Sequence, residues 1–260
     1  MTRSWPFVAT STAAQRTMRT PSSIVVTIAL YVVVAGTMTA LWRVAADSNG
    51  GSIGGYTAAQ LTWYLATSEA VTVCLSSRLI ERIGDEIADG SVAVEMLRPA
   101  PMLGMRLCSE FGACAPRLVA CAAAGFVLAT VTADSSPGAP ALVLTIPAMA
   151  LAVACNLVAQ HAVAAAAFWL RDARSSWFLY QKLVFILGGM LIPLELMPSV
   201  LRTICFALPF AAMAYAPARL ASGHVEPWLL VVQIGWLAVL SCAAIAAFRA
   251  GQRRLQVVGG

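Results

Sequence analysis

The chain has 260 residues, of which 60% are hydrophobic and only 11% are charged; its mean hydropathy is +0.79 and its formal net charge is +5. A typical soluble domain is about 45 to 50% apolar and about 25% charged. This composition excludes a water-soluble fold and indicates an integral membrane protein.

Six apolar segments follow one another along the chain. A helix needs roughly 20 apolar residues to cross a hydrocarbon core of about 30 Å. The fourth segment is too long for a straight crossing, and the fifth is short and ends near Pro193. We therefore predict an all-α polytopic membrane protein, a single domain over residues 1–260 with six transmembrane helices. The predicted spans are Ile24 to Trp42, Tyr56 to Ser76, Gly112 to Ala133, Ala141 to Leu170, Tyr180 to Glu195 and Trp228 to Phe248.

The basic residues between these segments predict the orientation, because Lys and Arg accumulate on the cytoplasmic side. The other side carries only Arg43, Arg202 and Arg219. Both termini are therefore predicted to be cytoplasmic, and contact with anionic lipid headgroups accounts for the net charge without any nucleic acid. The predicted cytoplasmic set is Arg3, Arg16, Arg19, Arg78, Arg82, Arg98, Arg106, Arg171, Arg174, Lys182, Arg249, Arg253 and Arg254.

The ends and the cysteines fit this interpretation. A segment of 23 residues precedes the first apolar core, which favours an uncleaved anchor over a signal peptide. Residues 1–23 and 249–260 are then cytoplasmic termini. The seven cysteines lie mostly within spans and form no CxxC pattern, so they are interpreted as small hydrophobic residues. They are Cys74, Cys108, Cys114, Cys121, Cys155, Cys205 and Cys242.

The most informative stretch is the predicted cytoplasmic loop over residues 77–111. Apolar residues recur at helical spacing from Leu79 to Ile87, with charged residues on the other face, which predicts a short amphipathic helix ending at Gly90. A second helical run, Val92 to Leu97, is predicted to stop at Pro99. The loop is either a solvated connector lying on the headgroups or a docking element for a soluble partner.

Two ionisable residues fall inside predicted spans, Glu69 in the second and Arg117 in the third. Charge in hydrocarbon is costly, so each needs a partner or water. Both lie roughly 10 to 14 Å from the cytoplasmic ends at 1.5 Å per residue. We predict a structural ion pair between them; alternatively, Glu69 is protonated or lines a cavity while Arg117 snorkels to the interface.

Glycines and prolines interrupt the fifth segment and the region after it. Gly188 and Gly189 weaken the helix and Pro193 breaks it, and Pro198 and Pro209 impose further turns. Irregular backbone at membrane depth is tolerated only where protein or water covers it. Residues 193–227 are therefore predicted to form a re-entrant region that closes the outer end of a pathway.

Two motifs carry a family resemblance. The first is I-x-x-x-I-x-x-G followed by M-L-R-P in the 77–111 loop, and the second covers residues 188–223. Together they resemble the permeases of ABC-2 type transporters, in the branch with a Leu-Leu-Arg-Pro signature; Met96 departs from its first leucine. The matched positions are Ile83, Ile87, Gly90, Met96, Leu97, Arg98, Pro99, Gly188, Pro193, Leu194, Glu195, Pro198, Leu208, Pro209, Phe210, Pro217 and Gly223.

The resemblance implies the membrane subunit of an ATP-driven exporter in a bacterial cytoplasmic membrane, paired with itself or a related permease. It implies an interfacial helix near Thr12 to Thr20 and an outer gate that includes Glu195. It also implies a coupling helix, which docks on a separate ATPase subunit that holds ATP and Mg. The implied coupling residues are Arg78, Glu81, Arg82, Ile83, Asp85, Glu86, Ile87, Gly90, Leu97, Arg98 and Pro99.

Missing motifs agree with a non-enzymatic subunit. No G-x-x-x-x-G-K-[ST] phosphate loop and no clustered catalytic or metal-ligating set occurs, and His161 and His224 stand alone in the sequence. Two alternatives stay open: an ion-coupled secondary transporter using Glu69, and a non-transporting membrane anchor or immunity subunit. The transported substrate does not follow from the sequence.

Overall fold

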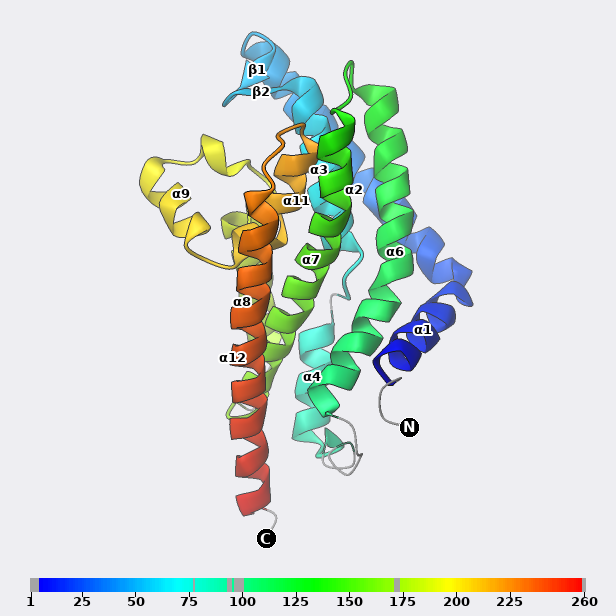
Figure 1. The fold of residues 1–260 in the computed structure, drawn as a ribbon, viewed down its shortest axis with the longest axis vertical. Coiled ribbons are helices and arrows are strands. Elements are labelled where there is room, and N and C mark those ends of the chain that lie inside the picture. The colour runs from blue at the N-terminus through cyan, green and yellow to red at the C-terminus, as the bar shows by residue number, and fades with distance from the viewer. Residues whose placement is uncertain (1–4, 77, 93–94, 96–100, 171–173, 259–260) are drawn as a thin grey trace.

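A computed structural model describes residues 5–76, 78–92, 95, 101–170 and 174–258, and Figure 1 shows their arrangement. This part of the chain is helical apart from one short antiparallel hairpin, β1 (Ser52–Ile53) and β2 (Tyr56–Thr57). The helices are α1 (Trp5–Met18), α2 (Pro21–Ser48), α3 (Ala58–Val73), α4 (Leu79–Ala88), α6 (Met102–Thr132), α7 (Ala139–Ala164), η1 (Ala165–Phe168), α8 (Arg174–Leu187), η2 (Leu194–Leu196), α9 (Ser199–Phe206), α10 (Phe210–Met213), α11 (Tyr215–Ala221) and α12 (Trp228–Val258).

Four helices are long and apolar enough to cross a membrane: α2, α6, α7 with η1, and α12. They confirm the predicted first, third, fourth and sixth segments as long apolar helices. The outer face of α2 leaves Val25, Val26 and Val33 more than half exposed. Side chains of this kind on an outer helix surface suit a lipid environment rather than water.

The predicted second and fifth spans form shorter helices. Helix α3 has 16 residues and α8 has 14, fewer than the roughly 20 that a full crossing requires. Helix α3 begins at a capping box, in which the Thr57 and Gln60 side chains each accept a hydrogen bond from the other residue's backbone N–H. Helix α8 ends at Leu187, six residues before Pro193, because the two glycines that follow end it first. The described residues therefore contain four helices long enough to cross a membrane.

Helix α3 lies at the centre of the molecule. It packs against α2, α6, α7 and α11, and most of its side chains are buried. Outside this group, α12 packs along α7 and α1 packs across the first half of α6. Helices α1 and α4 and the end of α12 lie toward the lower end of the molecule in Figure 1, and the β1–β2 hairpin lies at the upper end.

Candidate functional site

Helix α4 is the predicted amphipathic helix of the 77–111 loop, and its bounds agree with the prediction. Its apolar row is Leu79, Ile80, Ile83 and Ile87, each 5% exposed or less. This row packs against α7, η1 and α8. Gly90 follows the helix with φ +79°, a left-handed conformation that glycine adopts without strain. The apolar row therefore anchors α4 to the membrane-spanning helices.

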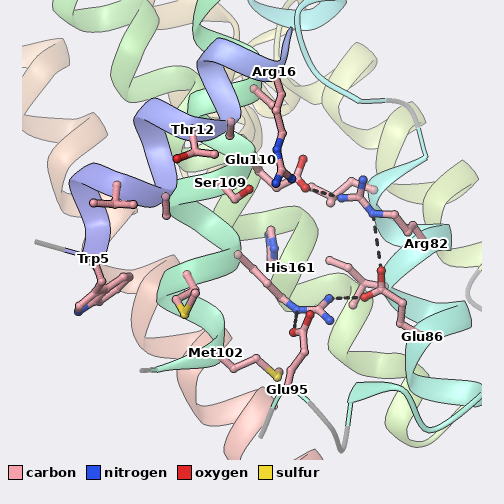
Figure 2. A pocket seen from close by; sticks show the side chains of 18 of the residues that line it. Trp5, Thr12, Arg16, Arg82, Glu86, Glu95, Met102, Ser109, Glu110 and His161 are labelled. Carbon is pink, nitrogen blue, oxygen red and sulfur yellow. Dashed lines mark hydrogen bonds and ion pairs between the residues drawn. The ribbon is translucent and has the colours of Figure 1, made fainter. Parts of the chain in front are cut away.

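Two charged residues of α4 turn toward α6 instead of away from the protein. Arg82 forms an ion pair with Glu110, and Glu86 Oε2 lies 2.6 Å from Arg106 Nη1. Arg106 Nε also donates to Glu95 Oε2 at 2.7 Å. Figure 2 shows these side chains converging from α4, α6 and the segment between them. We call Arg82, Glu86, Glu95, Arg106 and Glu110 the coupling network.

Sequence reasoning missed three members of this network. Arg106 was predicted only as a cytoplasmic charge, Glu95 only as part of the second helical run, and Glu110 was given no role. A signal was present, because residues four apart in a helix share a face. Helix α6 begins at Met102, so Arg106 and Glu110 together face α4.

The remaining charged residues of α4 face outward. Arg78 and Asp85 are exposed and Glu81 is partly exposed, and no ion pair to any of them occurs among the described residues. The outward surface is therefore narrower than the predicted docking face, which included Arg82 and Glu86. The predicted coupling residues Leu97, Arg98 and Pro99 lie outside the described residues, as does most of the predicted run Val92 to Leu97.

Helix α1 is longer than the predicted Thr12 to Thr20 segment and lies directly on α6. A Cβ atom added to Gly112 would come within 2.2 Å of the Thr10 carbonyl oxygen, so only glycine permits this approach. Thr17 Oγ1 donates to the Ala113 carbonyl oxygen at 3.4 Å nearby. A cavity of about 680 Å³ lies between α1, α4 and α6, and His161 of α7 also lines it.

The predicted Glu69–Arg117 ion pair does not form. Glu69 is only 2% exposed on α3, whereas the Arg117 guanidinium points to the start of α2 and donates to Ser23 Oγ at 3.4 Å. Counting residues places both side chains at a similar depth but says nothing about their rotation around the two helix axes. Arg117 instead reaches an open crevice that Ser22 and Ser23 also line.

The predicted outer gate begins with the two glycines after α8. Gly189 has φ +70°, and its carbonyl oxygen accepts a 2.5 Å hydrogen bond from Tyr64 of α3. A Cβ atom at Gly188 would lie 2.3 Å from the Val184 carbonyl oxygen. Pro193, Pro198 and Pro209 then stand as the residues before η2, α9 and α10. The predicted positions are thus the break points of an irregular chain.

Arg219 of α11 is the centre of a polar cluster in this outer region. Its Nη1 donates to Tyr56 Oη at 2.7 Å and lies 3.3 Å from Glu195 Oε1, and its Nη2 lies 3.1 Å from Glu226 Oε1. Tyr215 Oη donates to the same Glu195 oxygen at 2.6 Å. We call Arg219, Tyr56, Glu195, Tyr215 and Glu226 the outer network. The sequence placed Arg219 only as an outer-loop charge.

Nothing in the described residues suggests metal chemistry, because no group of three His, Cys, Asp or Glu side chains is close enough to hold an ion. His224 contacts the outer network through its ring, whose centroid lies 5.5 Å from that of Tyr56. Burial, together with the positive charge of Arg219, lowers the pKa of His224.

Comparison with protein families gives one match. Neither curated proteins nor solved structures returned a significant match. The model of the ABC-2 family transporter protein matches residues 23–259, nearly the whole chain. Both motifs that carried the resemblance lie inside this range. The chain belongs to the ABC-2 family of transporter membrane proteins.

Proposed function

We propose that this chain is the permease subunit of an ATP-binding cassette exporter in a bacterial cytoplasmic membrane. Family membership establishes a transporter membrane protein, and α4 supports the finer assignment. This helix is held to the membrane-spanning helices by its apolar row and to α6 by the coupling network, and it leaves Arg78, Glu81 and Asp85 facing outward. A separate ATPase subunit would bind ATP and Mg and dock on this outward surface.

The coupling network suggests how docking would act on the pathway. A displacement of α4 would be transmitted to the N-terminal turns of α6 through the Arg82–Glu110 and Glu86–Arg106 ion pairs. Helix α6 continues for 31 residues to Thr132 at the other end of the molecule. A rigid helix transmits a push at one end along its whole length, so ATPase closure would reach the outer region.

Pairing of two permease chains completes the proposal. The central helix α3 is enclosed within one chain, while the outer faces of α2 and α12 carry exposed apolar side chains, among them Val33 and Val231. We propose that a central pathway forms between two copies, or between this chain and a related permease, and that lipid covers the other faces.

The test is association with a cognate ATPase subunit, measured as copurification of the two chains in detergent. The variant Glu81→Lys combined with Asp85→Lys should abolish copurification, because it reverses two charges on the outward surface of α4. Asp134→Lys is the matched control, since Asp134 is an exposed acidic residue in the α6–α7 loop at the opposite end. Full copurification of the double variant would sink the assignment of α4 as the docking element.

Glu69 supports one alternative function, ion-coupled secondary transport. Its carboxyl group is almost completely buried on the central helix and has no ion-pair partner among the described residues, which is a setting typical of a coupling carboxylate. Transport by reconstituted protein separates the two functions. Glu69→Gln should leave ATP-driven transport intact, and transport that instead requires Glu69 and an ion gradient would replace the exporter assignment.

A further inference from the structure

The cavity between α1, α4 and α6 has walls of two kinds. Its volume of about 680 Å³ is within the range of small-molecule sites, roughly 300 to 1,000 Å³. Trp5 and Val8 of α1 and Met105 of α6 give it an apolar wall, and the coupling network gives it a charged wall. Figure 2 shows His161 between the two. Such a cavity suits a ligand with both an apolar and a polar part.

His161 indicates that the polar part of the ligand must donate a hydrogen bond. The side chain is fully buried, and its Nδ1 lies 2.8 Å from the Leu157 carbonyl oxygen. A carbonyl only accepts hydrogen bonds, so Nδ1 carries the proton, and in the neutral ring Nε2 is left with a lone pair. Nε2 is buried and meets no hydrogen-bond partner among the described residues. Since buried polar atoms are nearly always paired, this atom calls for a donor from a ligand.

Arg16 supplies a cation at the mouth of the same cavity. It is exposed on α1 and lines the cavity, and unlike Arg82 and Arg106 it has no ion pair with any residue that the structure describes. A guanidinium group in this state is suited to a phosphate, which accepts charge-assisted hydrogen bonds from it.

The remaining observation concerns the route of entry. Helix α1 leaves Phe7, Val8 and Met18 more than half exposed, and it lies at the outside of the molecule beside α6 (Figure 1). An interfacial helix buries side chains of this kind in the headgroup and acyl boundary of a bilayer. The cavity beneath α1 is therefore within reach of membrane lipid.

We propose that this cavity binds an aminophospholipid whose headgroup carries a primary ammonium. The ammonium would donate to His161 Nε2, the phosphate would pair with Arg16, and the start of an acyl chain would lie along Trp5 and Val8. A lipid in this place would contact both α1 and the coupling network, so its presence would hold α4 against α6. The proposal does not depend on the identity of the transported substrate or on the ATPase.

The test compares two lipids that differ in one property. Phosphatidylethanolamine and phosphatidylcholine share the phosphate, but the quaternary ammonium of choline has no N–H to donate. Delipidated protein in detergent is titrated with each lipid at matched acyl chains, and bound lipid is counted by native mass spectrometry. Phosphatidylethanolamine should bind on the order of tenfold more tightly, as expected for one extra hydrogen bond to a buried acceptor. Equal binding would overturn the proposal.

Substitutions test whether the preference for phosphatidylethanolamine over phosphatidylcholine depends on His161. His161→Phe removes the acceptor, so the difference between the two lipids should disappear, whereas His161→Gln keeps an acceptor and should retain part of it. Arg16→Gln should weaken both lipids alike, because both carry the phosphate. His224→Phe and Arg19→Gln are matched controls outside the cavity and should change nothing. A preference that survives in His161→Phe would refute this site.

Soluble phosphoethanolamine separates a lipid from a free headgroup. It presents the same ammonium and phosphate without acyl chains, so it should displace bound phosphatidylethanolamine only at far higher concentration. Displacement at equal concentration would assign the cavity to a soluble phosphoester and contradict a membrane ligand. The lipid comparison uses the unmodified chain, so it remains decisive even if a His161 variant fails to fold.

Discussion

The coupling network and the outer network lie at opposite ends of the molecule and are built differently. In the coupling network two arginines meet three glutamates, and the side chains of Arg82 and Arg106 are 50% and 14% exposed. In the outer network one arginine, 17% exposed, meets two glutamates and a tyrosine hydroxyl. The first network ties a surface helix to a long apolar helix, and the second ties together irregular segments that have no long helix of their own.

This difference predicts different sensitivities. Ion pairs that stay partly exposed contribute little to stability and are weakened by salt, so the coupling network can rearrange at low cost. Removing the only arginine of a cluster that also contains the buried Tyr56 and Tyr215 leaves uncompensated carboxylates and costs much more. The outer network should therefore govern stability, and the coupling network should govern communication between α4 and α6.

Arg219→Ala should have the largest effect. It leaves Glu195 and Glu226 without their cation and Tyr56 without its donor, and it should lower the free energy of unfolding by about 3 kcal/mol, or Tm by about 6 °C or more. Thermal unfolding in detergent measures this. Arg202→Ala, an exposed arginine of α9, is the control and should be near neutral. Equal Tm values for the two variants would contradict the prediction that the outer network governs stability.

Gly189→Ala comes second. The position has φ +70°, and an added Cβ atom would lie 2.9 Å from Leu194 and 3.1 Å from the Tyr64 hydroxyl. The combined strain and crowding should cost about 2 kcal/mol. Gly50→Ala is the matched control, because Gly50 has φ +78° but open space around it, so only the backbone strain of about 1 kcal/mol should remain. Unfolding of both variants under the same conditions gives the difference, and a larger loss in Gly50→Ala would be the contrary result.

Arg106→Gln should have a small effect on stability and a large effect on transport. The substitution leaves Glu95 without its ion-pair partner and leaves Glu86 with only the 3.9 Å pair to Arg82. Both carboxylates are about one third exposed, so the stability loss should be only about 1 kcal/mol. Transport by the complex with its ATPase should fall by much more than copurification does. Arg253→Gln, exposed on α12, should leave both measurements unchanged. Loss of copurification in parallel with transport would show that Arg106 acts on docking and not on transmission.

Local patterns were sufficient to predict the elements. The apolar periodicity of α4 and the glycine that ends it are both set within about ten residues. The four long apolar helices follow from continuous apolar runs of the sequence. Helices α3 and α8 are shorter than the roughly 20 residues expected of a span, because hydropathy does not show where a helix stops. Helix α3 is apolar on all sides since it is enclosed by other helices, which gives the same pattern as contact with lipid.

The polar contacts were mostly beyond prediction, because they join residues that lie far apart in the chain. Arg219 and Tyr56 are separated by 163 residues, and no local pattern indicates their contact. The predicted Glu69–Arg117 pair failed for a related reason, since depth was known and helix rotation was not. Arg106 and Glu110 were within reach of prediction, because both precede a predicted span at a spacing of four residues.

The smallest expected effect on stability comes from exchanging the charges of Arg82 and Glu110. Arg82 is half exposed, so each single variant, Arg82→Glu or Glu110→Arg, should cost only about 0.5 kcal/mol in the free energy of unfolding. Each single variant should nevertheless impair transport, because it places like charges at the junction of α4 and α6. The double exchange restores opposite charges and should recover transport, most clearly at low salt, where screening is weakest. If the double exchange transports no better than either single variant, this ion pair does not connect the two helices in function, and transmission would have to run through Arg106 or through the apolar row of α4 alone.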